Sequence, residues 1–157
     1  MADALDARKL AWWFCLAVGV SLLLNWILGL VFGGREFATS DDPPRSEFNF
    51  FFEFNGWHHL LHVLTAAVLV AAIFRRDWAP ACALLFGAVY LVLTPLAVAD
   101  GNDVANAVYS DTPDNFVHGS LAVAGVALGV AGFRAAYAAS ASASPAARSP
   151  DSIAPSR

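Results

Sequence analysis

Residues 56–74 read GWHHLLHVLTAAVLVAAIF, and this run indicates how the chain folds. A helix needs about 20 mostly apolar residues to cross the hydrocarbon core of a bilayer, and this run has close to that length. Other runs of the same kind lie before and after it in the chain. The sequence therefore predicts an all-α, polytopic membrane protein with four transmembrane helices, at about residues 10–32, 56–74, 78–99 and 113–137.

The composition also indicates a membrane protein. Hydrophobic residues make up 58% of the 157 residues and charged residues 14%, whereas an average soluble domain has about 45–50% and about 25%. The connections between the apolar runs favour an up-down-up-down bundle in a single domain, residues 1–137. The remaining residues, 138–157, are rich in Ala, Ser and Pro, and we expect them to form a disordered cytoplasmic tail.

The basic residues are distributed unevenly about the predicted helices. Seven of the nine lie on the side that holds both termini, whereas the connection between the third and fourth helices is acidic and has no Lys or Arg. By the positive-inside rule, both termini are cytoplasmic and the acidic loops lie outside. The acidic loops also argue against nucleic acid as a partner. The seven basic residues are Arg8, Lys9, Arg75, Arg76, Arg134, Arg148 and Arg157.

Two short stretches with histidines resemble each other, and each begins an apolar helix. The first runs from His58 to His62, and the second is Asp114-Asn115-Phe116-Val117-His118. Ionisable side chains within a membrane span are costly, so each of these histidines is a candidate functional residue. His58 and His62 are four residues apart and share a helix face, whereas His59 lies off that face, and we expect it near the headgroups.

The fourth predicted helix has a stripe of small residues below its histidine. Gly125, Gly129 and Gly132 follow His118 at helical spacing, and small residues spaced in this way let helix backbones approach closely. His118 therefore faces another helix rather than lipid. Thr112 is the expected N-cap of this helix.

Depth along the helices brings several polar side chains to one level. His62 is about 9 Å, and His118 about 8 Å, from the outer ends of their helices at 1.5 Å per residue. We therefore expect a polar cluster in the outer half of the bundle that is structural or binds a small ligand. The candidate members are Asn25, Asn55, His58, His62, Thr94, Asp114, Asn115 and His118.

The chemistry of this cluster has several interpretations. Hydrogen bonds between helices would fix their register without any ligand, and the sequence favours a protein without a cofactor. Alternatively, His58, His62 and His118 have the residue type and spacing of metal ligands, with Asp114 nearby to complete the set. Two histidines on facing helices could instead hold a haem. Against the metal interpretation, the chain has no His-Glu-x-x-His motif.

Two further interpretations concern what the whole protein does. Histidines that titrate near neutral pH could make it responsive to protons, and its duplicated helical hairpins could form a small-solute transporter in an oligomer. No arrangement of nucleophile and base stands out, so no catalytic residue is predicted and a non-enzymatic protein is favoured. The expected partner is the lipid bilayer, with a homo-oligomer or another membrane protein left open.

The two histidine motifs resemble those of a known family. Residues 55–62 read NGWHHLLH and residues 114–118 read DNFVH. Runs of the form Asn-x-x-His-(Asn)-x-x-His and Asp-Asn-x-x-His open the second and fourth helices of small prokaryotic integral membrane proteins described as a domain of unknown function. The resemblance implies a four-helix bundle in the cell membrane of a prokaryote, and it implies no activity. His59 departs from the Asn usual at its position, so no role is carried over to it.

Overall fold

The computed structural model describes residues 2–32, 37, 55–105 and 107–143. Within these residues, four helices are long and apolar enough to cross a membrane, as the sequence predicted. A short 3-10 helix, η1 (Arg76–Trp78), joins the second helix to the third, and strands β1 (Asp103–Val104) and β2 (Val108–Tyr109) pair in the connection before the fourth. The helices are α1 (Ala2–Phe32), α2 (Gly56–Phe74), α3 (Ala79–Ala99) and α4 (Thr112–Ala143).

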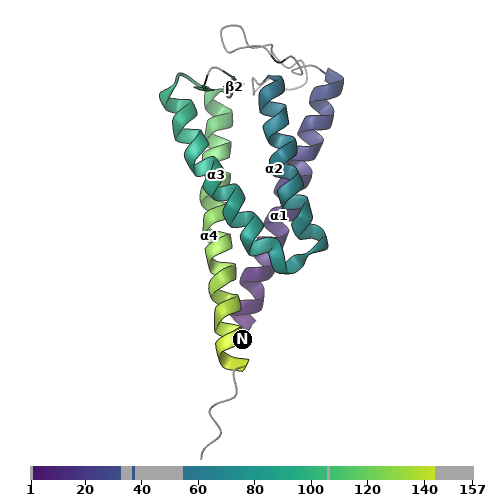
Figure 1. The fold of residues 1–157 in the computed structure, drawn as a ribbon, viewed down its shortest axis with the longest axis vertical. Coiled ribbons are helices and arrows are strands. Elements are labelled where there is room, and N and C mark those ends of the chain that lie inside the picture. The colour runs from purple at the N-terminus through teal and green to yellow at the C-terminus, as the bar shows by residue number, and fades with distance from the viewer. Residues whose placement is uncertain (1, 33–36, 38–54, 106, 144–157) are drawn as a thin grey trace, which may run out of the picture.

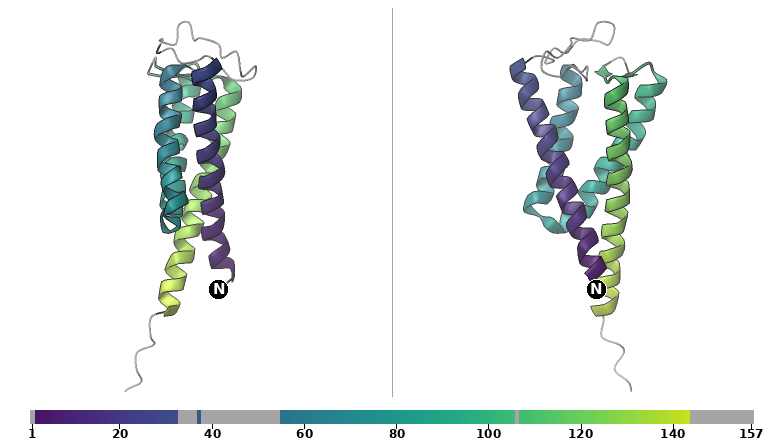
Figure 2. Two further views of the ribbon diagram at one scale, coloured as in Figure 1. Left: turned by 90° about the vertical axis from the view of Figure 1, so that its right-hand side faces the viewer. Right: turned by 180° about the vertical axis from the view of Figure 1, so that it is seen from behind.

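The helices form two hairpins that diverge toward one end of the molecule. Contacts are most extensive between α1 and α2 and between α3 and α4. The start of α1 and the end of α4 lie at the same end of the structure, and from there α1 and α4 diverge toward the end that carries β2 (Figures 1 and 2). The β-hairpin lies over that wider end.

The α3–α4 pair is held by close approach of the two backbones. A Cβ atom added to Gly125 would lie 2.8 Å from the carbonyl oxygen of Ala83, and one added to Gly129 would lie 2.6 Å from Cβ of Leu84. Gly132 packs in the same way against Pro80. Helices in lipid associate through such tight van der Waals contact, because burial from water supplies no driving force there.

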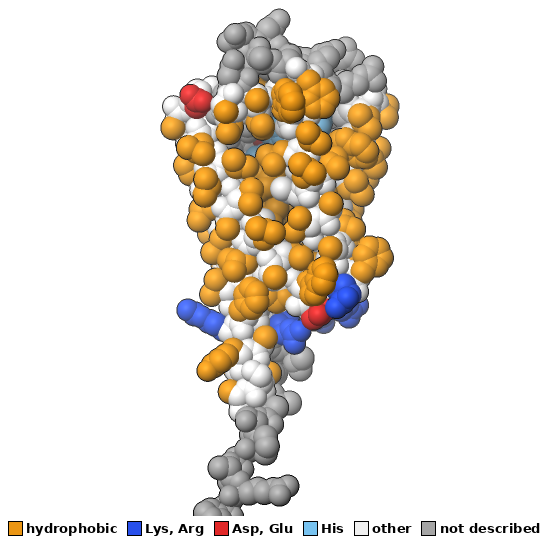
Figure 3. All heavy atoms as spheres, viewed as in Figure 1, with side chains coloured by type: hydrophobic (Ala, Val, Ile, Leu, Met, Phe, Trp, Pro, Cys, Tyr) orange, Lys and Arg blue, Asp and Glu red, His pale blue; other side chains and the backbone are white. Residues whose placement is uncertain are grey.

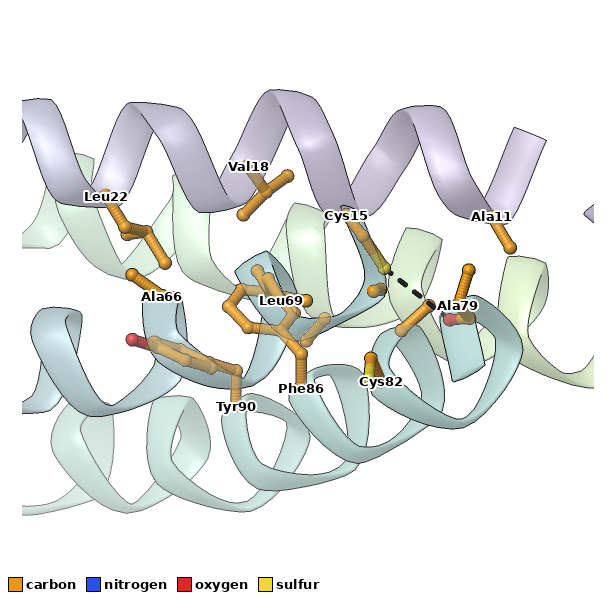
Figure 4. Packing of buried hydrophobic residues seen from close by; sticks show 13 residues of the cluster. Ala11, Cys15, Val18, Leu22, Ala66, Leu69, Ala79, Cys82, Phe86 and Tyr90 are labelled. Carbon is orange, nitrogen blue, oxygen red and sulfur yellow. Dashed lines mark hydrogen bonds between the residues drawn. The ribbon is translucent and has the colours of Figure 1, made fainter. Parts of the chain in front are cut away.

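A cluster of buried hydrophobic residues has members on all four helices. Its largest members are Tyr90, Phe86 and Leu69, and most of the others are small (Figure 4). The thiol of Cys15 donates a hydrogen bond to the carbonyl oxygen of Ala79 at 3.5 Å, which ties α1 to the start of α3. The small side chains allow all four helices to meet in this region.

The outer surface of the helices is apolar. Large hydrophobic side chains are exposed on every helix, and they cover the face seen in Figure 3 above a group of Lys and Arg side chains near the narrower end. Exposure of this extent is unfavourable in water and suits a lipid environment. Examples from the four helices are Leu24, Leu64, Val92 and Val123.

Two helices are longer than the sequence indicated. Helix α1 begins at Ala2 rather than near residue 10, because its first residues are mostly strong helix formers such as Ala, Leu, Lys and Arg. Helix α4 continues through Ala143, beyond the expected end at residue 137, into an alanine-rich stretch in which Ser142 bonds back to the carbonyl of Ala138. The rest of the predicted tail, residues 144–157, lies outside the described residues, as does most of the loop before α2.

The glycine contact between α3 and α4 gives a testable prediction. In Gly125→Ala the new methyl group would meet backbone atoms of α3, so we expect a loss of about 1–3 kcal/mol in unfolding free energy, as in other overpacked sites. Thermal unfolding in detergent, followed by circular dichroism, measures this change. Gly119→Ala is the matched control: its new methyl group would meet the Thr94 methyl group at 3.5 Å, an ordinary contact. Equal destabilisation by the two substitutions would contradict the close packing of α3 on α4.

Candidate functional site

Three histidines from two helices converge in the wider part of the bundle. Nε2 of His62 lies 2.9 Å from Nε2 of His58 on the same face of α2, and 3.3 Å from Nε2 of His118 on α4. All three residues are buried, with exposed fractions of 1% for His58, 3% for His62 and 6% for His118. One ring nitrogen from each lies within 4.8 Å of the other two, which is the arrangement of ligands around a metal ion.

The opposite nitrogen of each α2 ring faces a hydrogen-bond acceptor. Nδ1 of His58 lies 2.6 Å from the carbonyl oxygen of Tyr109, and Nδ1 of His62 lies 3.2 Å from Oδ1 of Asn25 on α1. The carbonyl oxygen of Tyr109 can only accept, and Oδ1 of Asn25 faces His62, so we assign the ring proton of both histidines to Nδ1. In a neutral imidazole the other nitrogen then presents a lone pair.

His118 has a carboxylate beside its Nδ1. Its Nδ1 lies 3.4 Å from Oδ2 of Asp114, one turn earlier on α4. The hydroxyl of Ser110 lies 2.7 Å from the same oxygen and positions it. Asp114 also lies 3.5 Å from Nε2 of His58, so its negative charge is close to the whole cluster.

Three lone pairs therefore point toward one another in a buried space. Without a positive charge between them, Nε2 atoms at 2.9 and 3.3 Å repel each other. Backbone carbonyl, amide and carboxylate acceptors on the far side of imidazole rings are the usual supports of metal-binding histidines, because they fix the tautomer and the ring orientation. The arrangement is chemically suited to holding a cation.

The start of α2 is fixed by the side chain of Asn55. Its Oδ1 accepts the backbone N–H of His58 at 3.1 Å as the N-cap, and its Nδ2 donates to the carbonyl oxygen of Ala107 at 2.6 Å. This second bond ties the β-hairpin to α2. It brings the carbonyl of Tyr109 onto the ring of His58.

The start of α4 is fixed by the residues just before it. Asp111, rather than the expected Thr112, caps the helix, since its Oδ1 accepts the N–H of Asp114 at 2.9 Å. Asn115 donates to the Ser110 carbonyl and to Oδ1 of Asn102, each at 3.1 Å. Asn115 thus stabilises the connection before α4, whereas Asp114 contacts the histidines.

Thr94 lies beside the histidines and lines a cavity next to them. The cavity has a volume of about 130 Å³, lies between α2, α3, α4 and the β-hairpin, and is also lined by His58, His118 and Tyr90. Among the described residues, Oγ1 of Thr94 has no hydrogen-bond partner. The Tyr90 hydroxyl instead lies 3.3 Å from Oγ1 of Thr65.

A second hollow reaches the histidines from the side. It is a groove of about 410 Å³ between α1 and α4, at the place where these helices diverge (Figure 2). His62, His118, Asn25 and Asp114 line it together with apolar side chains of both helices. The histidine cluster is therefore accessible from between two helices as well as from the internal cavity.

His59 does not lie where the sequence indicated. It was expected near the headgroups, yet it is only 4% exposed. Its ring occupies the space over Gly29 of α1, where any Cβ atom would overlap it. The expectation was wrong because it considered one face of α2 and not the glycine on the neighbouring helix.

Comparison with known proteins identifies the family and adds no activity. The family described as Domain of unknown function (DUF4383) matches residues 13–131, a stretch that contains both histidine motifs. Searches of curated proteins and of solved structures found no match. The chain belongs to the DUF4383 family, in agreement with the resemblance carried by its histidine motifs.

Proposed function

We propose that this protein is an integral membrane protein that binds a divalent transition metal ion through Nε2 of His58, His62 and His118. The observation that supports it best is the set of three oxygen acceptors on the Nδ1 side of these rings. They leave three nitrogen ligand atoms close together on buried residues. A cation between the rings relieves the repulsion and keeps the Nδ1 hydrogen bonds of His58 and His62.

The spacing of the nitrogens suits a tetrahedral ion. With metal–nitrogen bonds of about 2.0–2.1 Å, nitrogens on a tetrahedral ion lie about 3.3–3.4 Å apart. The two distances to Nε2 of His62 are 2.9 and 3.3 Å, close to this spacing, and the ligand atoms of all three rings lie within 4.8 Å of one another. Three protein ligands leave a fourth position for another molecule, a typical arrangement for zinc sites that bind exogenous ligands. Imidazole nitrogen also suits copper, iron and nickel.

The alternatives predicted from the sequence fit this geometry less well. A haem needs a slot as wide as its porphyrin between two axial rings, and Nε2 atoms 3.3 Å apart on His62 and His118 leave none. A purely structural cluster would need a proton between His58 and His62. That proton would cost one ring its Nδ1 bond or add a positive charge to a buried site, where Asp114, 3.5 Å from Nε2 of His58, would have to balance it.

The orientation that we assign to the bundle is up-down-up-down with both termini in the cytoplasm. It rests on the basic residues of the narrower end, which include Arg8, Lys9, Arg75 and Arg76, and on the acidic connection before α4 (Figure 3). In this orientation the metal site lies in the outer half of the membrane.

Metal content tests the proposed function directly. Purified protein incubated with Zn²⁺ and passed through a desalting column should retain about one zinc per chain, as measured by elemental analysis, because three histidines form a single site. His62→Gln and His118→Gln should each lose most of this zinc. His59→Gln is the matched control, since His59 is also buried on α2 but lies outside the cluster. A wild-type protein without zinc, or equal loss in the control, would contradict the proposal.

Asn25 tests the support of the ligands separately from the ligands themselves. Asn25→Ala removes the acceptor for Nδ1 of His62, so we expect a metal affinity about 10–100-fold weaker. Asn25→Asp keeps an acceptor and should retain most of the affinity. Ser21→Ala, one turn away in the same groove, is the control. Competition with a metal indicator measures all four proteins, and an unchanged affinity in Asn25→Ala would show that the assigned tautomer is wrong.

Reporter fusions test the orientation. Alkaline phosphatase is active only outside the cytoplasm, so a fusion after Gly101 should be active and one after Arg76 should be inactive. Green fluorescent protein at the same positions should give the reverse pattern. Activity of the phosphatase after Arg76 would invert the assigned orientation and place the site in the inner half of the membrane.

A further inference from the structure

The groove between α1 and α4 is open along its outer side. Ala17, Ser21 and Val117 line it and are exposed, whereas Val18 and Leu22 form its buried wall. Because α1 is a membrane span, the surroundings at this depth are acyl chains rather than water. A molecule that enters the groove therefore arrives from within the bilayer.

The inner end of the groove is polar and ends at the histidines. Oδ1 of Asn25 accepts a hydrogen bond from Nδ1 of His62. The amide nitrogen of Asn25 has two N–H donors that can bind a ligand oxygen. Nε2 of His62 and of His118 meet here. The groove thus leads to the fourth position of the proposed ion.

The net charge of the proposed metal site indicates which polar group of a ligand would bind at this end of the groove. A divalent ion with three neutral histidines and one carboxylate, Asp114, has a net charge of +1. A net charge at membrane depth is costly, and a ligand with a single negative charge removes it. The head group should therefore be a monoanion that offers an oxygen to the metal.

The length and apolar lining of the groove indicate what the rest of the ligand is. The groove residues on α1 run from Asn25 down to Ala17, about 12 Å along the axis at 1.5 Å per residue. Leu22 and Val18 on α1 and Leu121 on α4 make this part apolar. A hydrocarbon chain can lie there, alongside the lipid chains outside.

We infer that the α1–α4 groove binds a long-chain fatty acid, with its carboxylate at the open position of the metal and its acyl chain along the apolar wall. This inference rests on the proposed function, because it requires the ion held by His58, His62 and His118. It adds the ligand class and the route by which that ligand reaches the metal.

Cobalt supplies a probe that separates the two claims, because the visible spectrum of Co²⁺ depends on its ligands. Titration of Co²⁺-loaded protein in a non-ionic detergent with oleate should change the spectrum and saturate at one oleate per metal. Acetate should act at least about tenfold more weakly, because the chain contact is lost. Oleyl alcohol, which is uncharged, should leave the spectrum unchanged at the same concentrations.

A groove variant tests the site of the chain. Val117→Trp should fill the groove and weaken the oleate response about tenfold or more through overpacking, with the cobalt spectrum unchanged before oleate is added. Val123→Trp, at a residue 61% exposed on the same helix, is the matched control. Cobalt binding with equal responses to oleate and acetate, or an oleate response that Val117→Trp leaves intact, would overturn this inference and leave the metal site standing. Absence of cobalt binding would overturn the proposed function itself.

Discussion

The oxygen acceptors behind the three histidines are the constraint on which the rest of the site depends. A carbonyl at His58 and an amide oxygen at His62 accept from Nδ1, and a carboxylate lies 3.4 Å from Nδ1 of His118. Nε2 of His62 then lies 2.9 Å from Nε2 of His58 and 3.3 Å from Nε2 of His118. These acceptors come from three different parts of the chain, the β-hairpin, α1 and α4, so the caps and turns that position them are as much part of the site as the rings.

The packing of the helices explains why the cluster lies where it does. Close backbone contact at Gly125 and Gly129 holds α3 to α4, and the hairpins meet tightly in the narrower part of the bundle. Toward the other end α1 and α4 diverge (Figure 2), and the histidines occupy the space between them. His58 and His62 come from one hairpin and His118 from the other. An ion bound by all three would join the two hairpins at the point where direct packing no longer does.

Much of the fold could be predicted from the sequence, because length and apolar composition are sufficient to define a membrane span. Helical spacing also placed His58 and His62 on one face of their helix. The residues that position the histidines were harder to predict. Tyr109 contributes a backbone carbonyl, which its residue type does not indicate, and Ser110 acts only through its contact with Asp114. The burial of His59 depends on a glycine of another helix, so its own position along α2 could not reveal it.

The protonation state of the imidazoles tests the central claim most directly. A nitrogen NMR spectrum of the zinc-loaded protein, labelled at histidine, distinguishes a protonated nitrogen from a metal-bound one in each ring. We expect His58, His62 and His118 to carry the proton on Nδ1 and to bind zinc through Nε2, and we expect removal of zinc to leave the signals of His59 nearly unchanged. A proton on Nε2 of any of the three rings in the presence of zinc would contradict the proposed coordination.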